Sequence, residues 1–396
     1  MKYCVLIMDG SAGWPLPERD GKTCLELAVT PNLDAMANEG MVGLANTIPK
    51  DMEPSSASAC MSLLGYDPKV YYKGRAAIEA VSMGVPITEG EVVFRCNLVS
   101  TKDGRMNSYC AGHIGTNEAA ELIKALNEAL GRNDVIFYTG VSYRHLLKLK
   151  GHTDTLEANC TPPHDISGEF IEDFLPRGRG SRLLKELMHA SRAVLKEHPI
   201  NTLRRSVGDL TADMIWLFWG SGRIPDIPVF LKSYGLSAAL TSGVDLLRGL
   251  GRMMGMDILE IPGVTDGLDN DFQKQISGAL ESLNYYDMVV VHIEAPDEAG
   301  HAGSIDEKIE AIQFIDRDVI RRLRIYNPGK LRLLVMPDHP TPIETRTHVA
   351  EPVPFVLWGK GFVNNGAERF TELEAKKTGL FIQNGYNIMS MLVARE

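Results

Sequence analysis

Three apolar, strand-like runs that each lead into an aspartate constrain the fold of this chain more than any other feature. The runs and their aspartates are residues 3–8 with Asp9, residues 288–293 with Asp297, and residues 331–336 with Asp338. Short and uniformly apolar runs predict buried parallel strands. The carboxyl ends of parallel strands in an open α/β sheet face one crevice, so we expect the three aspartates at the same sheet edge.

Histidines accompany two of these aspartates. His301 follows Asp297 by four residues, His339 directly follows Asp338, and His348 comes soon after. An aspartate and a histidine four apart face the same way on a helical turn, but such a pair is common by chance, and His348 alone is typical of a loop. The joint occurrence is more specific. Crowded carboxylates repel one another unless a cation lies among them, so the set predicts one or two divalent metals with oxygen and nitrogen ligands.

Composition excludes several classes of protein. The chain has 396 residues, 44% of them hydrophobic, which is enough for two domains. Its net charge of −10 argues against a nucleic-acid binder but permits a small anionic substrate beside a metal. The six cysteines form no CxxC pair and predict reduced thiols in a cytoplasmic protein. We expect no signal peptide and no membrane span, because no apolar run approaches the ~18 residues required.

The pattern of predicted strands and helices changes in the middle of the chain. Predicted strands at 92–99 and 135–139 alternate there with predicted helices at 118–130 and 181–196, and none of these strands ends in an aspartate. The pattern of strands and helices resumes after residue 232, with a helix at 305–323 and a further strand at 352–359. We therefore expect a discontinuous α/β domain, residues 1–75 and 232–396, with helices on both faces of its sheet. Residues 76–231 are expected to form an inserted, smaller α+β domain.

Some single residues have both a structural and a functional interpretation. A group of serines that includes Ser56 follows Pro54 and opens a predicted helix, where unpaired N–H groups form an anion cradle. Ser56 is either a helix cap or, beside metals, a nucleophile. Arg144, after a strand of the insert, is either a surface residue or a planar donor for a phosphate or carboxylate. His292, inside an apolar strand, is expected to be a core histidine.

Several longer stretches carry a resemblance to a known family. They are MDG at 8–10, KTCLELAVTPNLDAMANEG at 22–40, MSLLGYDP at 61–68, GVSYRHLL at 140–147, TPPHDI at 161–166, HIEAPDEAGH at 292–301, PDH at 337–339 and THVAEPVPF at 347–355. Through them the chain resembles the cofactor-independent phosphoglycerate mutases of the archaeal type, within the alkaline phosphatase superfamily, along nearly its whole length. The resemblance implies an alkaline phosphatase-like sheet and an enzyme of glycolysis and gluconeogenesis that interconverts 3-phosphoglycerate and 2-phosphoglycerate.

The resemblance also implies cofactors and site residues. Two divalent metals, manganese or zinc, are expected, and neither bisphosphoglycerate nor a nucleotide. The expected ligands are Asp9, Ser56, Asp338 and His339 for one metal, and Asp297, His301 and His348 for the other. Ser56 would be the nucleophile that carries the phosphoryl group. The insert would bind the phosphorylated acid substrate, with Arg144 the first candidate and Asn97 and His113 the next.

The chain departs from its relatives around the nucleophile. Relatives usually have Gly-Ser-Asp, whereas this chain has Ser55-Ser56-Ala57. The register set by MSLLGYDP favours Ser56, with Ser55 and Ser58 as the alternatives. The same metals and serine would also serve a homoserine-type phosphotransferase or a phosphomonoesterase, which are the alternative functions. A catalytically inactive binding protein is disfavoured because none of the seven ligands is missing. No oligomeric state is predicted.

Overall fold

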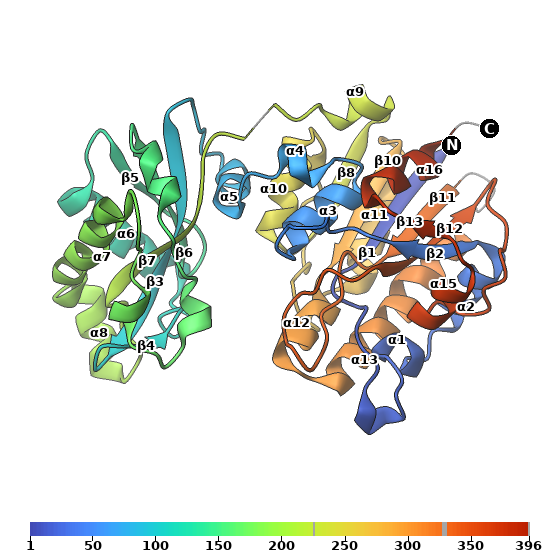
Figure 1. The fold of residues 1–396 in the computed structure, drawn as a ribbon, viewed down its shortest axis with the longest axis horizontal. Coiled ribbons are helices and arrows are strands. Elements are labelled where there is room, and N and C mark those ends of the chain that lie inside the picture. Colours follow the sequence, from blue (N-terminus) through green and yellow to red (C-terminus); the bar gives the residue numbers. More distant parts are fainter. Residues whose placement is uncertain (225, 327–330, 395–396) are drawn as a thin grey trace. The chain divides into compact units, whose positions relative to one another are not determined.

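The protein is described by a computed structural model that covers residues 1–224, 226–326 and 331–394 (Figure 1). The chain divides into two compact units. One unit comprises Met1–Tyr72 and Asp226–Glu396, and the other comprises Lys73–Pro225. The first unit contains all three aspartates that follow the apolar runs. The division of labour between a metal-binding and a substrate-binding domain remains a prediction.

The first unit is built on an eight-stranded sheet of order β13-β2-β12-β11-β1-β10-β8-β9. The strands are β1 (Lys2–Met8), β2 (Met41–Ala45), β8 (Ala238–Thr241), β9 (Asp257–Ile258), β10 (Met288–Ile293), β11 (Leu331–Met336), β12 (Val353–Gly359) and β13 (Phe381–Ile382). All pairings are parallel except those that β12 makes with β11 and β2. The carboxyl ends of the other strands therefore share one edge.

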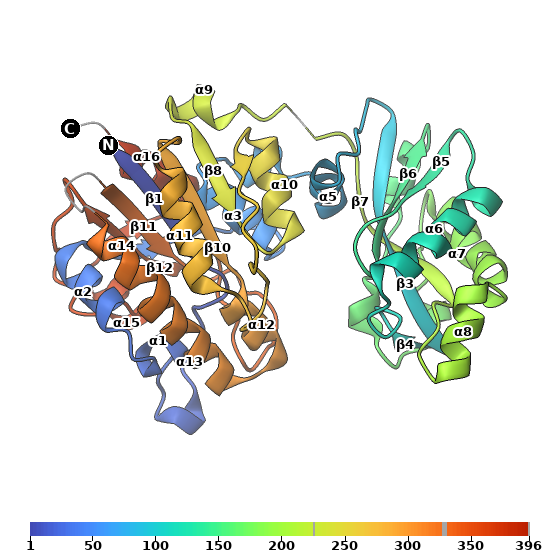
Figure 2. The ribbon, with the colours of Figure 1, turned by 180° about the vertical axis from the view of Figure 1, so that it is seen from behind.

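Strand β1 lies between β10 and β11, as the apolar runs predict. Met8 is paired with Ile293 of β10, and Ile7 is paired with Met336 of β11. Side chains on both faces of these strands are buried, because helices cover the sheet on both sides. Helices α3 (Ser56–Leu63) and α16 (Ile388–Val393) lie on the face seen in Figure 1, and α11 (Phe272–Ser282) and α13 (Ile305–Phe314) on the face seen in Figure 2. The predicted α/β class is confirmed.

The helix predicted at 305–323 differs from the structure in one respect. It is divided into α13, a π-helical segment at Ile315–Ile320 and α14 (Arg321–Ile325). The π-helical segment includes the buried Asp316, whose carboxylate accepts hydrogen bonds from the Asn32 side chain (2.8 Å) and the Leu33 N–H (2.7 Å). These bonds tie the segment to the first turn of α2 (Pro31–Glu39). Periodicity does not reveal such a local widening of a helix.

The second unit contains a five-stranded antiparallel sheet. Its strands are β3 (Glu91–Lys102), β4 (Arg105–Ser108), β5 (Val135–Tyr138), β6 (Arg144–Lys150) and β7 (Met214–Ser221), with β3 paired to β4, β6 and β7. Helices α6 (Thr116–Leu130) and α7 (Ser181–Lys196) bury leucines against one face of the sheet, and α5 (Arg75–Ser82) packs three alanines against Val93 and Leu146. This agrees with the predicted α+β insert.

The remaining α-helices complete the two units. They are α1 (Cys24–Leu27), α4 (Pro68–Tyr71), α8 (Pro199–Val207), α9 (Phe230–Tyr234), α10 (Asp245–Met253), α12 (Ala295–Ala302) and α15 (Glu372–Lys377). Within the described parts of the chain, every helix is too short or too polar to cross a membrane.

Candidate metal centre

One group of potential ligands comes from α12 and the loop before β12. Asp297 and His301 lie one helical turn apart on α12, and His301 Nε2 is 3.1 Å from Asp297 Oδ2. His348 Nε2 lies 3.5 Å from the same carboxylate oxygen and 2.9 Å from His301 Nε2. Three ligand atoms therefore converge on one point, as a single bound cation requires.

Hydrogen bonds and neighbouring charges fix the orientation and the protonation of this group. His301 Nδ1 donates to the Arg346 carbonyl (2.9 Å), which leaves Nε2 to face Asp297. Burial lowers the pKa of His301, but the hydrogen bond and charge of Asp297 outweigh it and raise this pKa to about 9. Burial conversely raises the pKa of Asp297, yet hydrogen bonds from His301 and His348 hold it well below its usual value. The carboxylate is thus ionised and surrounded by groups that favour its charge.

A second group lies at the ends of β1 and β11. His339 Nε2 is 3.2 Å from Asp338 Oδ2 and 3.5 Å from Asp9 Oδ1, and all three side chains are completely buried. The other oxygen of Asp338 accepts hydrogen bonds from the N–H groups of Gly10 (3.2 Å) and His339 (2.8 Å), which fix its orientation. The expected strand-end geometry therefore brings these residues together.

Gly10 lies where the group around Asp9 meets the group around Asp297. Its φ of +59° lies in the left-handed region, and a Cβ atom on it would lie 2.3 Å from Asp297 Oδ1. Only glycine allows the loop after β1 to pass directly against the Asp297 carboxylate. The backbone at Gly10 therefore packs directly against Asp297, which brings the two groups close together.

Ser56 is the serine that faces the second group. It is the first residue of α3, and its Oγ lies 3.1 Å from His339 Nε2. Ser55 instead caps the helix by accepting a hydrogen bond from the Ser58 N–H (3.3 Å), and the Ser55 and Ser58 hydroxyls bond to each other at 3.0 Å. The alternative nucleophiles are thus engaged in helix capping.

Two residues near this group were not predicted as site residues. His292 is buried, as expected for a core histidine, but its Nε2 lies 2.7 Å from Asp9 Oδ2 and 3.3 Å from Glu294 Oε2. Its Nδ1 lies 2.9 Å from the Ser242 hydroxyl oxygen, so both ring nitrogens have polar neighbours. Burial lowers the pKa of His292 to about 4. Glu294 directly follows β10, so the strand-end rule that identified Asp9 would also have found it.

The charge of the combined site fits divalent cations. Burial, and then the charge of Asp338, raises the pKa of Asp9 well above its usual value. Among the described residues, Asp9 Oδ1 and Glu294 Oε2 are buried without a hydrogen-bond partner. Unpaired buried carboxylate oxygens are unfavourable unless a proton or a cation satisfies them. The oxygen and imidazole donors suit manganese or zinc but do not distinguish between them.

The insert holds the three residues predicted to bind substrate. Asn97 of β3 and Arg144 of β6 are paired across neighbouring strands. The Tyr143 ring contacts two of the candidates, because the Arg144 guanidinium lies 5.8 Å and the His113 ring 6.3 Å from its centre. Within the described chain the Arg144 guanidinium makes no hydrogen bond or ion pair, so its donors are available to an anion.

Sequence patterns missed two further arginines beside them. Arg95 is buried, forms an ion pair with Glu79, and donates to the Asn97 side chain (3.1 Å). Arg75 pairs with the same Glu79 (3.0 Å) and lies over the Trp219 ring at 4.6 Å. Trp219 has a φ of +49°, which is rare for a bulky residue and typical of functional sites. The insert therefore gathers Arg75, Arg95 and Arg144 in one region, and Glu79 pairs with the first two of them.

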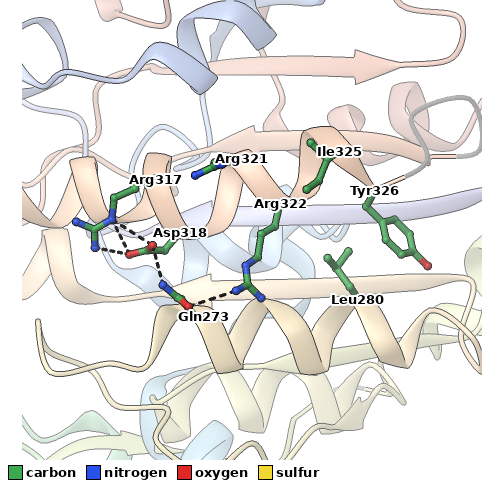
Figure 3. A pocket seen from close by; sticks show the side chains of 8 residues that line it. All are labelled: Gln273, Leu280, Arg317, Asp318, Arg321, Arg322, Ile325 and Tyr326. Carbon is green, nitrogen blue, oxygen red and sulfur yellow. Dashed lines mark hydrogen bonds and ion pairs between the residues drawn. The ribbon is translucent and has the colours of Figure 1, made fainter.

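A separate pocket of about 610 Å³ lies between α11 and the end of the α13–α14 helical region (Figure 3). Two of the arginines that line it, Arg317 and Arg322, bond to neighbouring side chains. Arg317 bonds Asp318, and Arg322 bonds Gln273 (3.3 Å). None of its lining residues is a candidate ligand, so the candidate metal centre does not involve this pocket.

Comparison with known proteins identifies the family. A family model described as 2,3-bisphosphoglycerate-independent phosphoglycerate mutase matches residues 37–201. The mutase of that name from Methanothrix thermoacetophila is 44% identical over 397 residues, which cover 100% of both chains. A structure of a protein from Pyrococcus horikoshii shares the fold, with a TM-score of 0.83 and 24% identity over 100% of this chain and 98% of that one. The cofactor-independent phosphoglycerate mutase of Thermoplasma acidophilum matches with a TM-score of 0.65 and 27% identity over 99% of both. This chain belongs to the family of 2,3-bisphosphoglycerate-independent phosphoglycerate mutases.

Proposed function

We propose that this protein interconverts 3-phosphoglycerate and 2-phosphoglycerate through a phosphoserine at Ser56, with two divalent cations bound at the ends of β1, β10 and β11. Membership of the mutase family supports the reaction. The observation that carries the proposal is the placement of Ser56 Oγ, 3.1 Å from a histidine of a buried aspartate–histidine cluster. A serine hydroxyl is a weak nucleophile until a neighbouring base or metal ion activates it, and such a cluster can supply that activation.

The cluster supplies the ligands in two sets. Asp9, Asp338 and His339, with Ser56, would hold one cation, and the group around Asp297 would hold the other. When bound, such cations neutralise phosphoryl oxygens and favour ionisation of a nearby hydroxyl at neutral pH. Manganese and zinc are the proposed metals because both accept mixed carboxylate and imidazole ligands.

Ser56 would exchange the phosphoryl group with the substrate in two steps. Its Oγ forms a bond to phosphorus as the bond between phosphorus and the 3-oxygen of the substrate breaks. The glycerate then takes the phosphoryl group on its 2-oxygen, and Ser56 is restored. The N–H groups in the first turn of α3 lie beside Ser56 and favour an anion at this position.

The insert would recognise the substrate anion. The Arg144 guanidinium has unengaged donors, Asn97 is its buried partner on the neighbouring strand, and His113 lies against the adjacent Tyr143 ring. A planar guanidinium suits a carboxylate or phosphate with two parallel hydrogen bonds. Arg95 is paired with Glu79, so it is proposed to position Asn97 by the hydrogen bond at 3.1 Å.

A coupled assay tests the function. Purified protein, manganese and 3-phosphoglycerate, without bisphosphoglycerate or nucleotide, should yield 2-phosphoglycerate, and a chelator should stop the reaction. Release of inorganic phosphate without 2-phosphoglycerate would identify a phosphomonoesterase instead. Phosphorylation of homoserine without isomerisation would identify the other alternative. The Ser56→Ala variant is the control for activity from a contaminating mutase.

A further inference from the structure

Thr341 contacts one candidate ligand from each metal group. It lies in the loop after β11, is completely buried, and is not itself among the candidate ligands. Its hydroxyl donates a hydrogen bond to Asp297 Oδ1 and lies 3.3 Å from His339 Nδ1. Asp297 belongs to one group and His339 to the other, so a single hydroxyl joins the two.

The single proton of the Thr341 hydroxyl determines the direction of its hydrogen bond with His339. A threonine hydroxyl has one proton, and the Thr341 hydroxyl donates it to Asp297. Toward His339 the hydroxyl oxygen can therefore only accept a hydrogen bond. His339 must therefore carry a proton on Nδ1 and donate it to Thr341. This tautomer leaves Nε2, the atom that faces Ser56 and Asp9, with a lone pair for a metal.

Hydrogen bonds also fix the position of the Thr341 backbone. Its N–H donates to the Ala12 carbonyl (3.1 Å), in the loop that follows Asp9. The ammonium group of the buried Lys308 donates to both the Ala12 carbonyl (2.9 Å) and the Thr341 carbonyl (2.7 Å). A Cβ on Gly300 of α12 would lie 2.9 Å from the Thr341 methyl carbon, so the glycine allows Thr341 to pack directly against this helix.

We infer that Thr341 is a positioning residue that couples the two metal sites, because its hydroxyl sets the tautomer of His339 and the orientation of Asp297 together. This inference rests on the two-metal proposal above. Loss of a hydrogen bond to a metal ligand commonly weakens metal binding by about 10–100-fold. Removal of this hydroxyl should weaken both sites, whereas removal of a ligand such as Asp297 should primarily affect its own site.

Two substitutions separate the hydroxyl from packing. Thr341→Val keeps the branched shape and removes the hydroxyl, and Thr341→Ser keeps the hydroxyl and removes the methyl group. Binding of Mn²⁺ to the chelator-treated full-length protein is followed by electron paramagnetic resonance of free Mn²⁺. We expect about 10–100-fold weaker binding at both sites in Thr341→Val and recovery to near wild-type binding in Thr341→Ser. Thr241→Val is the matched control, because Thr241 is also fully buried, at the end of β8, and its hydroxyl has no partner in the described chain.

The outcomes distinguish this inference from the proposed function. Wild-type protein that binds fewer than two Mn²⁺ ions would contradict the two-metal proposal and this inference with it. Two ions in the wild type with unchanged binding in Thr341→Val would overturn only the role of Thr341. Weakening at one site alone, or equal weakening in Thr341→Ser, would also overturn it, since the first denies coupling and the second assigns the effect to packing. Thermal unfolding of each metal-free variant identifies any loss of binding that stems from misfolding.

Discussion

The Ser56 hydroxyl lies 3.1 Å from Nε2 of His339, although the two residues are 283 positions apart in the sequence. The contact joins the first turn of α3 to the loop after β11. It places the serine against the Asp9–Asp338–His339 group, in which all three side chains are buried. Ser55 and Ser58 use their hydroxyls for each other. The geometry thus discriminates among serines that the sequence alone left as alternatives.

Substitution of Ser56, the proposed nucleophile, should abolish turnover and preserve the fold. Ser56→Ala should lower kcat by several orders of magnitude, because no group remains to accept the phosphoryl. Ser55→Ala should chiefly lower stability by about 1 kcal/mol through loss of the helix cap. Mutase kinetics and thermal unfolding of both variants, together with Ser58→Ala, test this. Near-normal kcat in Ser56→Ala would refute the assignment.

Removal of a ligand should release a single metal. Asp297 is the carboxylate on which His301 and His348 converge, so Asp297→Ala should lose one of two bound ions. Metal analysis of protein purified without chelator measures the ratio of ions to chains. Glu298→Ala is the matched control, since Glu298 is the exposed neighbour on the same helix. Full occupancy in Asp297→Ala, or equal loss in the control, would show that the ligand set is wrong.

Arg144 should affect substrate recognition without affecting metal content. Truncation of a buried charged contact costs roughly 2–5 kcal/mol, and each ~1.4 kcal/mol is tenfold. Because Arg144 is only partly buried, we expect Arg144→Ala to lower kcat/KM by about two to three orders of magnitude. Arg132→Ala, which removes an exposed arginine paired with Asp134, serves as the control. Wild-type kinetics in Arg144→Ala would transfer the role to another residue, and loss of metal would contradict the separation of roles.

Much of the candidate metal centre could be predicted because its residues follow strand ends. Buried strands are recognisable from short apolar runs, and parallel pairing brings the residues after them to one edge. Asp9, Asp297 and Asp338 were found in this way, and the helical spacing of His301 placed it beside Asp297. Glu294 directly follows the strand that contains His292 and also satisfies this rule, whereas the contact of His292 with Asp9 is not evident from its apolar strand.

The supporting residues could not be predicted, because their roles depend on contacts between distant segments. Lys308 is an ordinary lysine on a predicted helix, yet its ammonium is buried beneath two loops. Thr341 has no distinguishing pattern, and its role arises from hydrogen bonds to Asp297 and His339. The π-helical segment of 315–320 likewise interrupts a pattern that is otherwise helical. Such features follow from packing, which spacing along the sequence does not encode.

A buried histidine of the insert should make stability depend on pH. Burial, and then the positive charge of Arg95, lowers the pKa of His145 to about 3, compared with ~6.5 for an exposed histidine. The unfolded chain therefore binds a proton that the folded chain excludes, so stability is lost as the pH falls below about 6.5, and the loss stops growing below about 3. Between pH 7 and pH 5 this histidine should remove about 2 kcal/mol of unfolding free energy.

The His145→Asn variant tests this dependence. Asparagine cannot titrate, but its side-chain oxygen can replace Nδ1 as the acceptor for the Gly140 N–H (3.1 Å). Urea unfolding of the full-length protein with metal present should show that the wild type loses about 2 kcal/mol more than His145→Asn between pH 7 and pH 5. His189→Asn, at an exposed position of α7, should behave like the wild type at both pH values. Equal losses in the wild type and His145→Asn would mean that another group controls the acid sensitivity of the insert.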